Sequence, residues 1–174
     1  MRIAIFSYAR TGSTTLYKYI KESLYLEGSV PPYTTQFFKD DYKTKIWEED
    51  SIVVKFMFEF LPLIDKIQKS FDKIIFLSRE SDIECAKSFA QAIKTGTWYY
   101  PYEYKDLPEE LINQNVAVIK QQRKKIQSLG GFQITYEEVF YTVDGIKRLN
   151  NYLGIVTNEF NYLLHPKHRL RQNI

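Results

Sequence analysis

Hydrophobic positions in this chain form short continuous runs that alternate with longer amphipathic stretches. The continuous runs are Arg2–Phe6, Ser51–Phe58 and Lys73–Ser78, and the short segment Phe132–Thr135 is expected to be a fourth strand. Apolar runs of this length, bounded by turn residues, are typical of strands buried on both faces of a parallel sheet. The amphipathic stretches, at 14–26, 59–70, 82–94, 107–129 and 143–153, repeat their apolar residues at helical spacing. The alternation predicts an α/β fold with helices packed against a central, mainly parallel sheet.

Two of the predicted helices carry further local signals. Proline is tolerated only in the first turn of a helix, so Pro62 should lie near the start of the helix at 59–70. In the helix at 82–94, four apolar residues share one face that we expect to be buried. They are Ile83, Ala86, Ala90 and Ile93. Residues 27–33 are rich in turn formers, and we expect a long connection from there to residue 50.

The composition is that of a globular protein, and we expect a single domain spanning residues 1–174. Hydrophobic residues make up 44% and charged residues 26%, which excludes both a disordered and a membrane-embedded chain. No run approaches the roughly 18 apolar residues of a membrane span, and a strand rather than a signal peptide opens the sequence. The single cysteine, Cys85, excludes an intramolecular disulfide and a cysteine-rich zinc site, and favours a cytoplasmic location. The net charge of +3 is too small to indicate nucleic-acid binding.

The segment Ser7–Thr15 connects the first predicted strand to the first predicted helix. Gly12 allows a tight turn, and one of the three hydroxyl residues after it should cap the helix. Free N–H groups and the positive end of the helix dipole then point at one place and form an anion site, and the anion bound at such sites is most often phosphate. The Walker A pattern G-x-x-x-x-G-K-[ST] is absent, because Gly12 is the only glycine and the cation, Arg10, precedes it. An ordinary capped helix is the alternative interpretation.

Two further cations and a hydroxyl fall near the carboxyl ends of the other strands. Lys55 lies near the end of the second predicted strand, Arg79 directly follows the third, and Ser88 lies about two turns into the next helix. Because ligands of open α/β sheets bind at the carboxyl ends of strands, Lys55 and Arg79 should share a rim with Arg10. An arginine and a hydroxyl that flank a helix start are able to hold a phosphate. Lys55 by itself is equally well explained as a solvated lysine.

Two motifs resemble those of sulfotransferases that use 3'-phosphoadenosine 5'-phosphosulfate (PAPS). The segment A-R-T-G-S-T-T-L, residues 9–16, is similar to their P-[KR]-[ST]-G-[ST]-T loop for the 5'-phosphosulfate. The stretch from Arg79 to Ser88 resembles their 3'-phosphate element, an arginine after a strand and a serine on the next helix. Its continuation into T-G-T-W at 95–98 and the position of Lys55 are similar to the Stf0-type branch. The Y-E-E-V segment at 136–139 resembles a late element that serves mainly the fold.

The resemblance implies a P-loop-NTPase-like three-layer sandwich and a sulfotransferase with PAPS as donor and 3'-phosphoadenosine 5'-phosphate (PAP) as product. The residues that it implies for the 5'-phosphosulfate are those of the loop: Arg10, Thr11, Gly12, Ser13, Thr14 and Thr15. Lys55 and Arg10 would neutralise charge during an in-line, metal-independent transfer, and Arg79 and Ser88 would hold the 3'-phosphate. A late basic loop would add Lys167 and Arg169, and a disordered basic tail is the alternative for these two residues. The aromatic segment 96–104 either packs on the next helix or stacks on adenine or acceptor.

The general base is not evident in the sequence. An acceptor hydroxyl needs a carboxylate or a histidine within hydrogen-bond reach. Related carbohydrate enzymes have a glutamate before a Phe-Phe-like pair, whereas the segment Tyr33–Phe38 contains no carboxylate. Glu59 is the substitute that we expect, with Glu27 and Asp40 as alternatives. Otherwise the chain has lost catalysis and kept donor binding.

Three functions therefore remain open. The first is a sulfotransferase acting on a carbohydrate or another small acceptor, without nucleic-acid or membrane partners. The second is a nucleotide or small-molecule kinase on the same fold, against which the missing Walker lysine and Walker-B-type aspartate count. The third is a non-catalytic module that binds an adenosine phosphate. Because the chain is short beside the sulfotransferases that it resembles, a homodimer or another partner is expected to complete the acceptor site.

Overall fold

The computed structural model describes residues 1–29, 46–96 and 107–156 of the chain. Its centre is a parallel sheet of five strands in the order β2-β3-β1-β4-β5. The strands are β1 (Arg2–Ser7), β2 (Glu27–Ser29), β3 (Ile52–Met57), β4 (Lys73–Ser78) and β5 (Phe132–Thr135). The α/β prediction is therefore confirmed, and β1 is the central strand.

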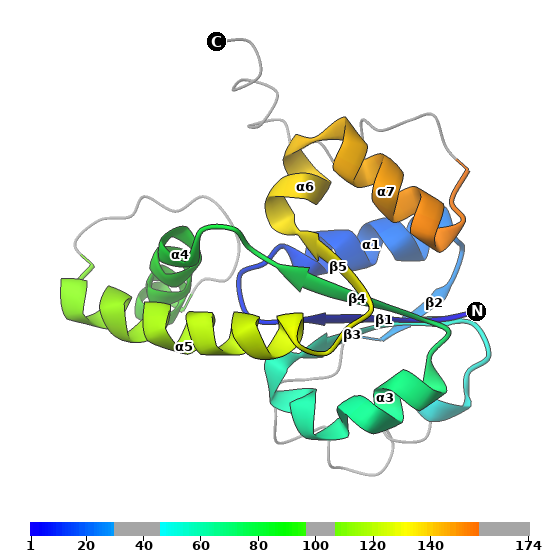
Figure 1. Ribbon diagram of the computed structural model, residues 1–174, viewed down its shortest axis with the longest axis horizontal. Coiled ribbons are helices and arrows are strands. Elements are labelled where there is room, and N and C mark those ends of the chain that lie inside the picture. Colours follow the sequence, from blue (N-terminus) through cyan, green and yellow to red (C-terminus); the bar gives the residue numbers. More distant parts are fainter. Residues whose placement is uncertain (30–45, 97–106, 157–174) are drawn as a thin grey trace.

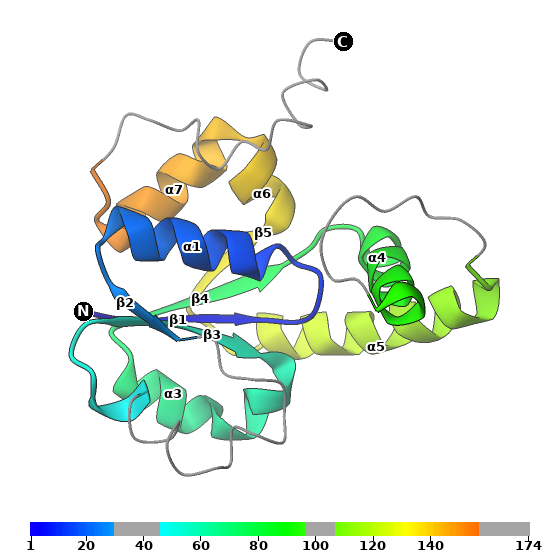
Figure 2. The ribbon, with the colours of Figure 1, turned by 180° about the vertical axis from the view of Figure 1, so that it is seen from behind.

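Helices cover both faces of the sheet, so the domain has three layers (Figures 1 and 2). One face carries α1 (Ser13–Ser23), α6 (Tyr136–Tyr141) and α7 (Val143–Leu153). The other face carries α3 (Ile64–Ser70) and part of α5 (Glu109–Gln127), while α4 (Asp82–Thr95) packs along α5 beyond the carboxyl ends of the strands. Within the described ranges, no helix combines the length and the apolar character that crossing a bilayer requires.

The alternation of side chains along β1 supplies both hydrophobic cores. Ile3 and Ile5 point into the core beneath α1 and α7, whereas Ala4 and Phe6 point into the core beneath α3 and α5. Successive side chains of a strand face opposite sides, so a strand buried on both faces reads as a continuous apolar run. The register pairs Ser7 with Met57 of β3 and with Leu77 of β4, and the three strands therefore end at one level.

The first connection differs from the prediction. The first helix ends at Ser23 rather than near residue 26, and residues 27–29 form the edge strand β2 instead of a turn. A strand of three residues is too short to show a hydrophobic pattern. Gly28 allows the close approach to α1, because a Cβ atom there would lie 2.0 Å from the Tyr17 hydroxyl.

The predicted helix at 59–70 consists of two elements. A 3₁₀ helix, η1 (Phe58–Leu63), contains Pro62, and the α-helix α3 begins only at Ile64. Proline lacks the N–H group that an α-helical bond at its position would need, so the regular ladder starts after it.

The predicted buried face of α4 was right for Ala86 and Ala90, which are fully buried, and wrong for its two isoleucines. Ile83 and Ile93 are 54% and 53% exposed, whereas Cys85, Ser88 and Gln91 are buried. The helix lies beyond the strand ends and packs on α5 and on the β1–α1 loop, so its polar side chains meet other polar groups.

The start of α1 is formed by Gly12 and not by a capping hydroxyl as the sequence suggested. Gly12 is the N-cap residue, has a left-handed φ of 76°, and makes no side-chain cap. Its carbonyl oxygen accepts hydrogen bonds from the N–H groups of Thr15 and Leu16, at 3.0 and 3.1 Å. A Cβ atom on Gly12 would lie 2.6 Å from Cδ2 of Tyr136 and 2.9 Å from Cε2 of Phe140. The turn that begins α1 is thus covered by side chains of α6, which lies near the end of the described residues.

Replacing Gly12 by alanine should destabilise the protein more than the same change at Gly154. Both glycines have a left-handed φ, 76° and 77°, but no atom lies within 4 Å of a Cβ on Gly154. Gly154→Ala should therefore cost about 1 kcal/mol of backbone strain, and Gly12→Ala about 1–3 kcal/mol more from overlap with Tyr136 and Phe140. Urea unfolding of the two variants measures the difference, and equal losses would contradict the steric role of α6.

Candidate functional site

The β1–α1 loop lies at the carboxyl end of the central strand and has an unusual backbone. Arg10 has a φ of 66° and Gly12 a φ of 76°, so left-handed residues flank Thr11 on both sides. Thr11 is fully buried, and its hydroxyl donates a hydrogen bond of 3.1 Å to the carbonyl oxygen of Tyr8. A left-handed arginine is uncommon and costs free energy, and such residues cluster at functional sites. Loops of this kind form concave anion sites from backbone N–H groups.

Lys55 of β3 reaches the first turn of α1. Its Nζ donates a hydrogen bond of 3.1 Å to Oγ1 of Thr14, and the residue is 5% exposed, so Lys55 is not a solvated lysine. Burial lowers the pKa of Lys55 below its ordinary value. Within the part of the chain that the structure describes, no carboxylate pairs with Lys55. A buried ammonium is favourable only when it is paired, so an anion held by the neighbouring loop would stabilise Lys55.

Arg10 connects the loop to α4. Its Nε donates a hydrogen bond of 2.8 Å to Oγ of Ser88, which is buried. The sequence assigned these two residues to different phosphate groups, and the structure brings them into direct contact. The serine oxygen accepts the bond, so the serine proton remains able to donate to a further oxygen.

Arg79 follows β4 and lies beside the same loop. Its Nη1 donates to the carbonyl oxygen of Arg10 at 3.5 Å, and its Nε forms an ion pair of 3.4 Å with Oε1 of Glu137. The guanidinium carbon lies 4.9 Å from the centre of the Tyr136 ring, within the range of a cation–π contact. Arg10, Ser88 and Arg79 therefore form one cluster, as expected from their positions at the strand ends.

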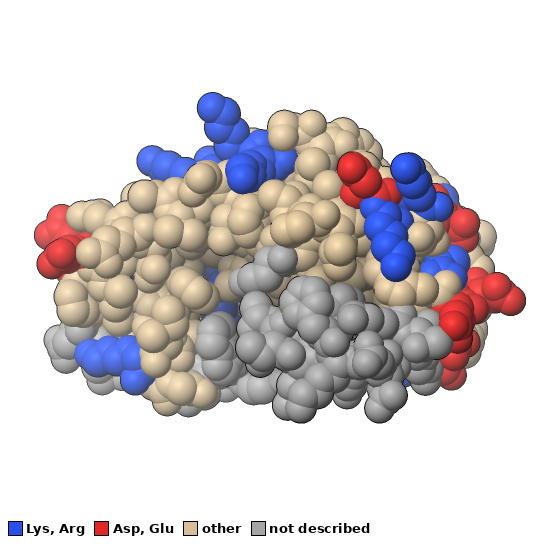
Figure 3. All heavy atoms as spheres, turned by 90° about the horizontal axis from the view of Figure 1, so that it is seen from below, with Lys and Arg blue, Asp and Glu red and all other residues tan. Residues whose placement is uncertain are grey.

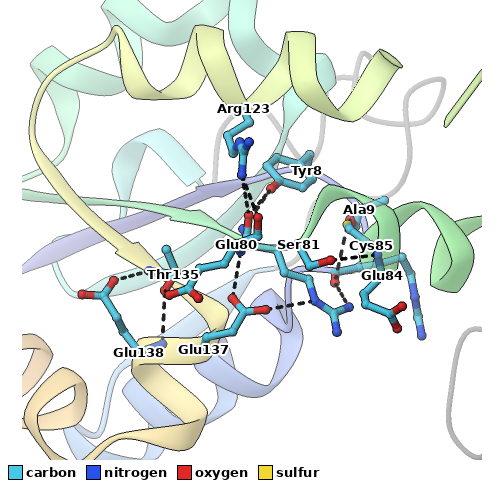
Figure 4. A network of polar contacts seen from close by, with 12 residues as sticks. Tyr8, Ala9, Glu80, Ser81, Glu84, Cys85, Arg123, Thr135, Glu137 and Glu138 are labelled. Atoms are coloured by element: carbon cyan, nitrogen blue, oxygen red, sulfur yellow. Dashed lines mark hydrogen bonds and ion pairs between the residues drawn. The ribbon is translucent and has the colours of Figure 1, made fainter. Parts of the chain in front are cut away.

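The backbone at Arg79 is held by side chains from two other elements (Figure 4). The Tyr8 hydroxyl accepts the N–H of Arg79 at 2.9 Å and donates to its carbonyl oxygen at 3.4 Å. Burial raises the pKa of Tyr8, so the phenol stays protonated and is able to do both. Arg123 of α5 donates to the carbonyl oxygens of Arg79 and Glu80, at 3.3 and 2.9 Å, and pairs with Oδ2 of Asp82 at 2.9 Å.

Arg123 belongs to a basic stretch of α5, residues 120–125. Lys120, Lys124 and Lys125 are exposed, but Arg123 is half-buried and points at the end of β4. Figure 3, which views the molecule from the side of α3 and α5, shows basic and acidic side chains separated by uncharged surface. The charged side chains of the described residues therefore form no continuous patch of one sign on this face.

Cys85 lies beneath the loop on α4. Its thiol is fully buried and donates to the carbonyl oxygen of Ala9 at 3.3 Å. Burial raises the pKa of Cys85 to about 12, so the thiol is protonated at neutral pH and is a poor nucleophile. The role that its contacts indicate for Cys85 is therefore to support the loop rather than to act as a nucleophile.

Several predicted residues cannot be placed in the cluster. Glu59 lies in η1, directly after β3, but its side chain is outside the described part of the structure. Lys167 and Arg169, like the aromatic residues at 97–104 and Asp40, are also outside the described residues. Glu27 begins β2 opposite Ile52, at the amino ends of the strands. The cluster lies at the carboxyl ends, so Glu27 is on the opposite side of the sheet from any reaction there.

Sequence reasoning missed three residues of this rim. Tyr8 comes directly after β1, and this position indicated that its side chain would lie at the carboxyl end of the strand, where ligands of such sheets bind. Glu137 lay within the Y-E-E-V segment that the resemblance assigned mainly to the fold. Arg123 had no signal, because neighbouring charges on an exposed helix look alike in a sequence.

Comparison with known proteins supports the fold and leaves the activity open. No protein-family model and no curated protein matches the chain. Among solved structures, shikimate kinase from Bacteroides thetaiotaomicron is similar with a TM-score of 0.58 at 13% identity, over 88% of this chain and 98% of that chain. Shikimate kinase from Aquifex aeolicus has a TM-score of 0.55 at 12% identity, over 88% of this chain and 96% of that chain.

A sulfotransferase is similar as well. Mouse sulfotransferase SULT7A1, complexed with PAP, has a TM-score of 0.51 at 16% identity, over 91% of this chain and 60% of that chain. Similarity to the Stf0-type branch stays a prediction. At these identities the likeness concerns the fold alone, and it confirms that this chain has the P-loop-like α/β fold shared by these kinases and sulfotransferases.

Proposed function

We propose that this protein is a sulfotransferase that binds PAPS on the rim formed by the β1–α1 loop, Lys55, Arg79 and Ser88. The observation that carries the proposal is the bond from Arg10 Nε to Ser88 Oγ beside Arg79. It joins the loop, which suits a 5'-phosphosulfate, to an arginine and a serine that suit a second phosphate. PAPS carries phosphates at both ends of its ribose, whereas the phosphates of ADP and ATP form a single chain.

The chemistry that these residues would support is an in-line displacement at sulfur. A bond forms between the acceptor hydroxyl oxygen and sulfur, the bond from sulfur to the 5'-phosphate oxygen breaks, and PAP leaves. Lys55 and the amides at the start of α1 would stabilise the negative charge on the leaving phosphate. Glu59, four residues after Lys55 and just past the end of β3, is the base that we propose for the acceptor proton.

Support for this assignment also comes from the fold of the PAP-complexed mouse sulfotransferase. The acceptor that we propose is a hydroxyl of a carbohydrate or another small molecule. Formation of a sulfated product from labelled PAPS distinguishes a transferase from a module that only binds the nucleotide.

A kinase is the second candidate, because both shikimate kinases match almost along their full length. Against it stand the missing Walker lysine and the residue after β4, which is Arg79 rather than a carboxylate. A kinase would require ATP and Mg²⁺, so magnesium-dependent binding of ATP would favour this candidate.

Thermal unfolding with PAP, ADP or ATP–Mg²⁺ at equal concentrations tests the proposal directly. PAP at a hundredfold its Kd should stabilise the folded state by about 2.7 kcal/mol, which raises Tm by about 5–10 °C in a chain of this length. ADP should have a clearly smaller effect, because it lacks the 3'-phosphate. Equal or reversed preference would reject the sulfotransferase and favour the kinase.

Replacing Arg79 by alanine should weaken PAP binding by about 10- to 100-fold, because charge-assisted hydrogen bonds to the 3'-phosphate are lost. The affinity for ADP should change much less. Arg148→Ala is the matched control: it removes the same charge from α7, where Arg148 pairs with Glu138 and donates to the carbonyl oxygen of Gln133. Titration calorimetry measures both affinities, and equal effects of the two variants would contradict the role of Arg79.

Replacing Lys55 by methionine should stabilise the ligand-free protein by about 1–2 kcal/mol and abolish transfer, because a desolvated charge is removed. The folded state lowers the pKa of Lys55, so its charge opposes folding most at pH values below that lowered pKa. The stability difference between variant and wild type should therefore shrink as the pH rises toward 10.5, the ordinary value for lysine. Denaturant titrations at several pH values check this, and a difference that grows with pH would contradict it.

A further inference from the structure

Glu137 joins two parts of the rim through one carboxylate. Its Oε1 pairs with Nε of Arg79 at 3.4 Å, and its Oε2 accepts the N–H of Glu80 at 2.9 Å (Figure 4). The side chain is only 19% exposed. Glu137 stands in the first turn of α6, directly after β5, which pairs with β4. The residue thus reaches across from the edge strand to the end of its neighbour.

The contacts of Glu137 determine which edge of the Arg79 guanidinium faces the loop. Glu137 engages the Nε edge, and the ring of Tyr136 lies against the guanidinium plane. Nη1 then lies 3.5 Å from the carbonyl oxygen of Arg10. This nitrogen of Arg79 is therefore directed toward the backbone of Arg10, whose side chain bonds Ser88. A guanidinium binds phosphate best when its donors are fixed in a fork, so fixing their direction favours one geometry of phosphate over others.

The negative charge of Glu137 has a second effect. Arg10 and Arg79 are two neighbouring cations, and without a counter-charge they would attract any anion, since charge alone confers little selectivity. Glu137 offsets one of these charges, so general anion attraction is weaker and the directed donors contribute a larger share of binding. Discrimination between two ligands depends on the difference between their affinities, so a smaller unselective contribution makes the directed donors more decisive.

We propose that Glu137 is a positioning residue that makes the rim prefer a 3'-phosphorylated nucleotide over ADP, an inference that rests on the proposed PAPS-type donor. It acts through Arg79 and does not touch the ligand. The Y-E-E-V segment would accordingly have a role in specificity in addition to its role in the fold.

Glu138 provides a matched control in the same helix turn. Its Oε2 accepts the N–H of Thr135 in a capping box, and its Oε1 pairs with Arg148, away from Arg79. Glu137→Gln and Glu138→Gln remove the same charge from adjacent positions, and both keep an oxygen that accepts the backbone N–H. Titration calorimetry of wild type and both variants with PAP, ADP and inorganic phosphate therefore isolates the contact with Arg79.

The preference for PAP over ADP should fall about tenfold in Glu137→Gln and stay at the wild-type value in Glu138→Gln. PAP should bind more weakly to Glu137→Gln, while ADP and inorganic phosphate should bind equally well or more tightly. A purely structural role would lower all three affinities together. Glu137→Asp, which keeps the charge but shortens the side chain, should also lose preference, and retained preference in this variant would overturn the positioning role.

The outcomes separate this inference from the proposed function. A wild-type protein with no preference for PAP would reject the proposed donor, and the inference with it. A wild-type preference that persists in Glu137→Gln, or falls equally in Glu138→Gln, would overturn the inference and leave the donor assignment standing.

Discussion

The pair of hydrogen bonds between the Tyr8 hydroxyl and the backbone of Arg79 ties the end of β4 to the end of β1. A buried phenol that both donates and accepts satisfies two backbone groups that have passed beyond the sheet ladder. The carbonyl oxygen of Arg79 is further bonded by Arg123, and its side chain by Glu137. The direction in which Arg79 leaves the sheet is thus set by β1, α5 and α6 together, and the geometry of the rim follows from it.

Most of the sheet could be predicted from sequence because β1, β3 and β4 are largely buried on both faces. These three strands coincide with continuous apolar runs, and all four predicted strands, β5 included, match the structure to within about a residue at each end. β2 could not be predicted, because three residues are too few to show a hydrophobic periodicity. Its position also depends on the close contact of Gly28 with α1, which the sequence does not reveal. The rim residues Arg10, Lys55 and Arg79 were predictable for the same reason as the strands: their positions at strand ends fix their location.

The contacts between rim residues were not predictable. The bond from Arg10 to Ser88 depends on a left-handed arginine and on the rotation of α4, and apolar spacing did not indicate that Ser88 is buried. Helical periodicity indicates the buried face only when the neighbour is an apolar sheet. α4 lies beyond the strands, next to a polar loop, so Ser88 is buried and Ile93 is exposed. Tertiary context overrides local pattern in such places, which are often functional.

The contact of Tyr136 with Gly12 spans almost the whole described chain. The turn that begins α1 is synthesised more than a hundred residues before the ring that closes over it. Tyr19 and Asn150, whose side chains form a hydrogen bond of 2.8 Å, are separated by 131 positions. Contacts this distant in sequence form late, because the loop between them must close first. A nascent chain that stops before α6 therefore has the β1–α1 loop without the aromatic side chains that close over it.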